Sequence, residues 1–68
     1  MGKKAYYGVY FPGKEKGKRA INKKFNGRNY HLEVLEPNKP MANKFKRRIK
    51  KIAGKHYKII IRKRIIRW

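Results

Sequence analysis

The chain has 68 residues, with 22 Lys and Arg against three Glu, and a formal net charge of +19 at pH 7. Such an excess of one sign repels itself in the compact state, so we expect a polyanion, above all nucleic acid, to supply the counter-charge. The sequence contains no Asp, Ser, Thr, Gln or Cys. Nucleophilic catalysis by Ser, Thr or Cys is therefore excluded, and with so few carboxylates we expect neither an enzyme nor a cofactor or small-molecule substrate.

The length allows one small domain, 1–68, whose single apolar core yields little net stability. Lys3 and Lys4 are followed by only a short apolar stretch, 5–11, which carries three tyrosines and no signal-peptide cleavage site. No segment approaches the ~18 apolar residues of a transmembrane helix. These features predict a cytoplasmic protein.

The first element expected is a strand over 5–11, because apolar residues alternate there with Gly and Tyr. The alternation places Tyr7 and Phe11 on one face and Tyr6 and Tyr10 on the other. Aromatic side chains thus occupy both faces of this strand.

Pro12 and Gly13 end the strand, and the segment 13–19 follows as a strongly basic loop with no apolar anchor. We expect this loop to follow a phosphate backbone.

A hairpin is expected next, because Asn26-Gly27 separates 20–25 from 28–36 and readily adopts a two-residue turn. Such a turn places Phe25 opposite Arg28. The alternation assigns one face to Tyr30, Leu32 and Val34, and the other face to His31, Glu33 and Leu35.

A helix is expected between Pro40, which suits a first turn, and Gly54, which suits the position after the last. The apolar stripe expected to face the core consists of Met41, Phe45, Ile49 and Ile52, with Ala42 and Ala53 beside it. The remaining face is cationic, and its like-charge pairs four residues apart are unfavourable in a free helix. A bound polyanion would remove that repulsion.

The last element expected is a strand over 56–68. In it Tyr57, Ile59 and Ile61 share one face, and the residues between them, Lys58, Ile60 and Arg62, share the other. Lys63-Arg64 interrupts the alternation, which predicts a bulge there, or a strand end followed by a basic tail.

The order strand, hairpin, helix, strand predicts a single α+β domain with a small antiparallel sheet and one amphipathic helix packed on it. The alternative is a small, strongly bent barrel with one helix.

Three basic clusters are candidate phosphate contacts, since such contacts need cations without fixed spacing. They lie in the basic loop, on the helix and along the last strand: Lys14, Lys16, Lys18, Arg19; Lys44, Lys46, Arg47, Arg48, Lys50, Lys51; Lys58, Arg62, Lys63, Arg64 and Arg67.

Four aromatic residues are candidates for stacking on unpaired bases, with core packing as the alternative for each. They are Tyr6, Tyr10, Tyr30 and Trp68. His31 and Glu33, with His56 as a third ligand, have a spacing that suits a metal poorly, and we expect a surface pair and no metal site.

In composition and in its segments Lys14-Glu15-Lys16-Gly17-Lys18-Arg19, Lys46-Arg47-Arg48-Ile49-Lys50-Lys51 and Arg62-Lys63-Arg64, the chain resembles the small, very basic proteins of ribosomes, especially archaeal ones. The resemblance implies a structural protein that neutralises folded ribosomal RNA beside neighbouring ribosomal proteins. Two alternatives remain open. One is a small architectural or viral regulatory protein that binds DNA, and the other is a cationic membrane segment over 57–68.

Overall fold

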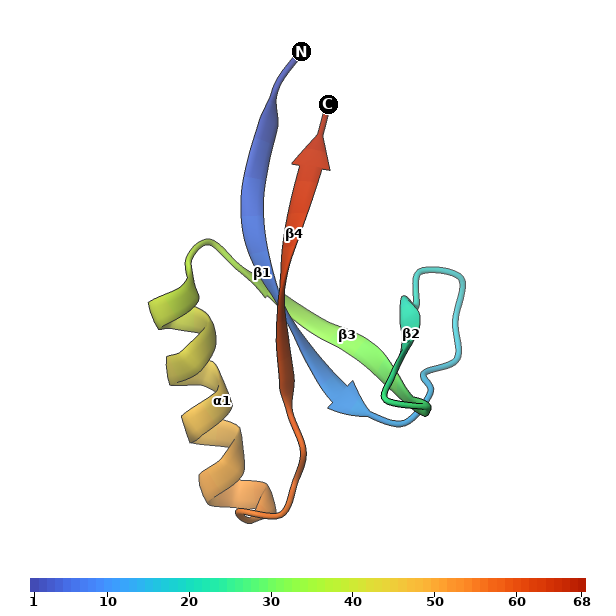
Figure 1. Ribbon diagram of the computed structural model, residues 1–68, viewed down its shortest axis with the longest axis vertical. Helices are drawn as coiled ribbons and strands as arrows, with labels where there is room; N and C mark the ends of the chain where they lie inside the picture. The colour runs from blue at the N-terminus through green and yellow to red at the C-terminus, as the bar shows by residue number, and fades with distance from the viewer.

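The computed structural model describes residues 1–68 and contains four strands and one helix. The elements are β1 (Lys3–Pro12), β2 (Asn22–Phe25), β3 (Arg28–Glu36), α1 (Lys39–Ala53) and β4 (Ile60–Arg67). The strands form one antiparallel sheet in the order β2-β3-β1-β4. The sheet curls into a half-barrel with α1 packed on it, which confirms the α+β prediction and approaches the bent-barrel alternative (Figure 1).

The β2–β3 hairpin forms as the sequence predicted. Asn26 and Gly27 have φ angles of 53° and 76°, the positive values that a tight two-residue hairpin turn requires at both positions. Phe25 pairs with Arg28 across this turn. The first strand of the hairpin begins at Asn22 rather than at Ala20.

A bulge in β3 changes the expected faces of that strand. Val9 of β1 pairs with Val34, but the next residue, Tyr10, pairs with Leu32, so Glu33 is an extra residue in the ladder. Val34 therefore packs with Val9 on the side that α1 covers. The expectation that Val34 shares a face with Leu32 and Tyr30 is wrong, because the inserted residue reverses the alternation.

The β4 strand pairs with β1 without interruption, from Lys3↔Arg67 to Tyr10↔Ile60. The bulge expected at Lys63-Arg64 is therefore wrong, and so is the start of the strand at His56. The N–H of Tyr57 instead donates to the carbonyl of Gly54 at 3.2 Å, which keeps this connection in a turn. Ile65 is 51% exposed, so no change of phase buries it.

The sheet has apolar side chains on both faces. On the side of α1, Val9, Ala42 and Ile59 are buried, and Phe11 stacks on Phe45 with ring centroids 6.1 Å apart. On the opposite, concave face, a second small core forms around an aromatic cluster. It consists of Tyr10, Phe25 and Tyr30.

Local signals fix both ends of α1. The side chain of Asn38 accepts a hydrogen bond from the backbone N–H of Met41 at 3.0 Å, which caps the first turn. At the other end Gly54, with a φ of 100°, donates its N–H to the carbonyl of Lys50 at 2.9 Å.

The buried stripe of α1 is shorter than the sequence predicted. Ala42 is buried, and Phe45 and Ile49 pack beside it. Met41 is 47% exposed and Ile52 is 81% exposed, so these two were wrongly assigned to the core. Ile52 belongs to the last turn of α1, which extends past the strands in Figure 1.

The two ends of the chain lie side by side (Figure 1). Pairing of β3 with β1 stops at Tyr7, so residues 3–6 and 64–67 form a two-stranded arm. Gly2 and Trp68 extend the arm by exchanging backbone hydrogen bonds of 2.8 and 3.0 Å. No helix has both the length and the apolar character needed to cross a membrane.

Candidate nucleic-acid interface

None of the 22 Lys and Arg side chains forms a salt bridge within the chain. The one ion pair joins His31 Nε2 to Glu33 Oε2 at 3.2 Å. Glu36 lines a depression with Lys44 and Arg48 but forms no salt bridge with either. Three Glu residues cannot balance 22 Lys and Arg, so most of the neutralisation must come from outside the chain.

The cationic face of α1 is hollowed rather than smooth. Lys44, Arg47, Arg48 and Lys51 line a depression of about 390 Å³ that contains no carboxylate, and all four side chains are exposed. We call this depression the helix hollow. The four residues meet because positions three and four apart on a helix are neighbours. Lys46 and Lys50, with Asn43 and Arg47, line a second depression of about 440 Å³ around the helix.

The basic loop is held by hydrogen bonds at its base. The Asn22 side-chain carbonyl accepts from the N–H of Glu15 at 2.9 Å, and its amide donates to the Glu15 carbonyl at 3.0 Å. Lys16, Lys18 and Arg19 then line an open depression of about 380 Å³. In Figure 1 this loop lies on the opposite side of the molecule from α1.

The basic residues of β4 divide between the two faces of the sheet. Arg62 and Arg64 lie on the concave face, where the Arg62 guanidinium sits 5.3 Å from the centroid of the Phe25 ring. Arg64 is half-buried over Gly8, and its Nη1 atom is buried without a hydrogen-bond partner. Lys63 and Arg67 point to the other face by the alternation of the strand and are exposed.

Two of the four aromatic stacking candidates are corrected by the structure. Tyr10 is 1% exposed and Tyr30 is 4% exposed, so neither ring can reach a base. Both pack edge-on against Phe25, with centroid distances of 5.1 and 5.6 Å, because the curl of the sheet brings the β2–β3 hairpin over β1. The concave face thus uses these rings as a core.

The other two stacking candidates remain accessible. Tyr6 is half-buried, with the Lys4 ammonium nitrogen 5.2 Å from its ring centroid. Trp68 is 69% exposed and lies over Gly2, where a Cβ atom would come within 2.6 Å of the indole ring.

His31 and Glu33 form the pair that the sequence predicted, with Nε2 and Oε2 3.2 Å apart. Glu15, rather than His56, lies beside His31 and Glu33, and one ligand atom from each falls within 4.8 Å of the others. Both ring nitrogens of His31 are already engaged, with Nδ1 at 3.0 Å from the Gly13 carbonyl and Nε2 on Glu33. These contacts tie the start of the basic loop to β3.

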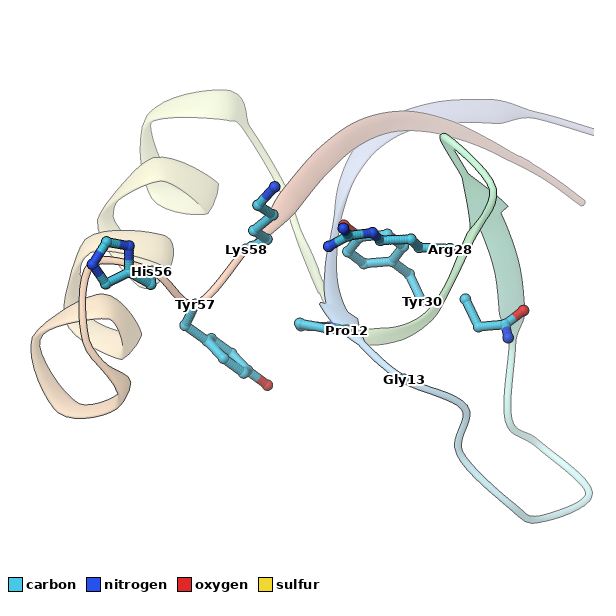
Figure 2. A pocket seen from close by; sticks show the side chains of 8 residues that line it. Pro12, Gly13, Arg28, Tyr30, His56, Tyr57 and Lys58 are labelled. Atoms are coloured by element: carbon cyan, nitrogen blue, oxygen red, sulfur yellow. The ribbon is translucent and has the colours of Figure 1, made fainter.

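A further groove, of about 390 Å³, opens where the end of β1, the start of β3 and the α1–β4 connection meet (Figure 2). We call it the nucleotide-sized groove. It is lined by Pro12, Gly13, Arg28, Asn29, Tyr30, His56, Tyr57 and Lys58.

Only Tyr30 and Lys58 of this groove were among the predicted site residues. Arg28, Tyr57 and His56 were missed because the groove is built from three segments far apart in the sequence. No local motif signals such a meeting.

No family model, no curated protein and no solved structure matches the chain.

Proposed function

We propose that this protein is a structural RNA-binding protein of a ribonucleoprotein particle, the cytoplasmic ribosome, and that it contacts folded RNA mainly through phosphates. The observation that carries the proposal is the complete lack of internal salt bridges to Lys and Arg in a chain of net charge +19. Phosphates are the abundant partners that can neutralise such a surface, and backbone contacts need no fixed side-chain spacing.

The distribution of the cations supports folded RNA over a single duplex. The helix hollow and the basic loop lie on opposite sides of the molecule, and Arg62 is exposed on a third surface, the concave face. One straight duplex contacts one side of a domain of 41 × 27 × 21 Å. Folded RNA can surround such a domain and supply phosphates to all three surfaces.

The same reasoning favours a structural role over a catalytic one. The three Glu residues are the only acidic side chains, and His31 and Glu33 are bonded to each other. The helix hollow is lined by Lys and Arg alone, and the nucleotide-sized groove holds His56, Tyr57 and Lys58 but no carboxylate to orient the imidazole as a general base.

A competition experiment tests the proposal. The purified protein is offered a structured ribosomal RNA fragment and a DNA duplex of the same length at about 0.15 M salt, close to physiological ionic strength. We expect the RNA to be bound more tightly, and two structured RNAs of unrelated sequence but matched bulges and loops to be bound with similar affinity. Tighter binding to the DNA duplex would refute the proposal in favour of an architectural DNA-binding protein.

A further inference from the structure

We propose that the nucleotide-sized groove captures a single unpaired nucleotide of the bound RNA, with the base against Tyr57 and the flanking phosphates on Arg28 and Lys58. This inference rests on the proposed function and adds to it the kind of RNA element recognised. It assigns a role to residues outside the helix hollow and the basic loop.

The lining of the groove has the chemistry of a nucleotide site. Arg28 and Lys58 are exposed cations, His56 is exposed beside them, and no carboxylate lines the groove. Figure 2 shows Tyr57 and Lys58 on the α1–β4 connection and Arg28 on the far side of Pro12, with the Lys58 side chain pointing away from the Tyr57 ring. A base on Tyr57 can therefore be met by Arg28 from the facing wall, and Lys58 is available to a flanking phosphate.

Tyr57 is held in place before any ligand binds. Its ring is half-buried and meets Phe11 edge-on, with centroids 5.5 Å apart and an interplanar angle of 75°. A ring fixed in this way loses little freedom when a base stacks on it, and such stacking tolerates any base.

Arg28 is positioned by the hairpin turn, since it directly follows Asn26-Gly27 and pairs with Phe25. Its planar guanidinium can bond a phosphate with two donors at once, or stack on the exposed side of a base.

The groove has a volume of about 390 Å³, within the range typical of small-ligand sites, roughly 300 to 1,000 Å³. The helix hollow has the same volume, so the aromatic lining rather than the size distinguishes this groove. A paired helix cannot enter a space of this size, whereas a base that leaves the stack can. RNA is recognised in this way at bulges and loops, where unstacked bases meet aromatic and Arg side chains.

The test compares three RNA hairpins that differ at one position in the stem. One is fully paired, one carries a single bulged 2-aminopurine nucleotide, and one carries an abasic bulge, which keeps the extra phosphate and lacks the base. With the full chain we expect the bulged hairpin to bind about tenfold more tightly than the other two. We also expect quenching of the 2-aminopurine fluorescence on binding.

Substitutions in the groove test whether the groove causes the preference for the bulged hairpin. Tyr57→Leu should abolish the preference and the quenching, and Tyr57→Phe should keep both, because Phe still offers a ring. Arg28→Gln should reduce the preference, and since Arg28 is exposed this variant serves if Tyr57→Leu unfolds the domain. The control is Arg48→Gln in the helix hollow, which should weaken binding to all three hairpins alike.

The outcomes separate this inference from the proposed function. Tight and equal binding of all three hairpins by the unmodified protein would overturn the nucleotide site and leave RNA binding standing. Equal gains from the base and abasic bulges would overturn it too, since the base would then play no part. Failure to bind any hairpin at about 0.15 M salt would overturn both proposals.

Discussion

Removing the positive charges of the helix hollow should change RNA affinity and domain stability in opposite directions. Replacing Lys44, Arg47, Arg48 and Lys51 by Gln removes four cations that are exposed and have no internal partner. We expect RNA affinity to fall while the domain becomes slightly more stable. The gain in stability comes from the like-charge pairs Lys44/Arg48 and Arg47/Lys51, each unfavourable by ~0.2 to 0.5 kcal/mol.

The size of the binding loss follows from counterion release. Each phosphate neutralised on a duplex contributes about 0.9 to the slope of log K against log salt, so four lost contacts reduce the slope by up to about 3.6. At about 0.15 M salt the same four contacts correspond to an affinity loss of up to roughly a thousandfold. Fluorescence anisotropy with a structured RNA at several salt concentrations measures both quantities, and thermal unfolding measures stability.

A matched control distinguishes a site from a general effect of charge. Lys3, Lys23, Lys24 and Lys55 are exposed cations outside the three basic clusters, and their replacement by Gln lowers the net charge by the same amount. We expect this variant to retain most of the affinity. Equal losses of affinity and slope in the two variants would refute the helix hollow as a phosphate site.

Three further substitutions test the local structure. Asn38→Ala removes the cap of α1 and should cost about 1 kcal/mol by chemical denaturation; an unchanged midpoint would contradict the capping contact. Asn22→Ala removes both hydrogen bonds that close the basic loop, so trypsin should cleave within 14–19 faster than in the parent, and equal cleavage rates would argue against the clamp. Tyr10→Ala should unfold most of the protein by circular dichroism, because loss of a buried aromatic costs ~3 to 5 kcal/mol, as much as a domain of this size has. A folded Tyr10→Ala variant with weakened RNA binding would instead restore Tyr10 as a stacking residue.

The elements that the sequence predicted well are those set by local signals. Asn26-Gly27 fixed the turn and the Phe25–Arg28 pairing, because positive φ at two neighbouring residues is a local property. Pro40 and Gly54 likewise placed the two ends of α1, which begins at Lys39, one residue before Pro40, and ends at Ala53, directly before Gly54.

The errors come from contacts between distant segments. The bulge at Glu33 depends on how β3 matches β1, and no residue type within β3 announces it. The sequence left base stacking and core packing open for Tyr10 and Tyr30. The structure buries both rings, because the curl of the sheet brings Phe25 over them. Burial of this kind is settled by tertiary packing rather than by strand periodicity.

The candidate site, like the fold, was only partly predictable from the sequence. The basic clusters of α1 and the loop are visible as runs of cations, since each lies on one element. The groove that joins Arg28 to Tyr57 needs the fold to bring three segments together, so its chemistry becomes visible only in the structure.

We propose that folded RNA supplies the counter-charge that this chain lacks. The most direct measurement is native sedimentation of the protein at its natural expression level and physiological salt, followed by sequencing of the nucleic acid that travels with it. We expect the protein to sediment with ribosomal particles and to be bound to ribosomal RNA. Sedimentation as a free protein, or with DNA in place of RNA, would contradict it.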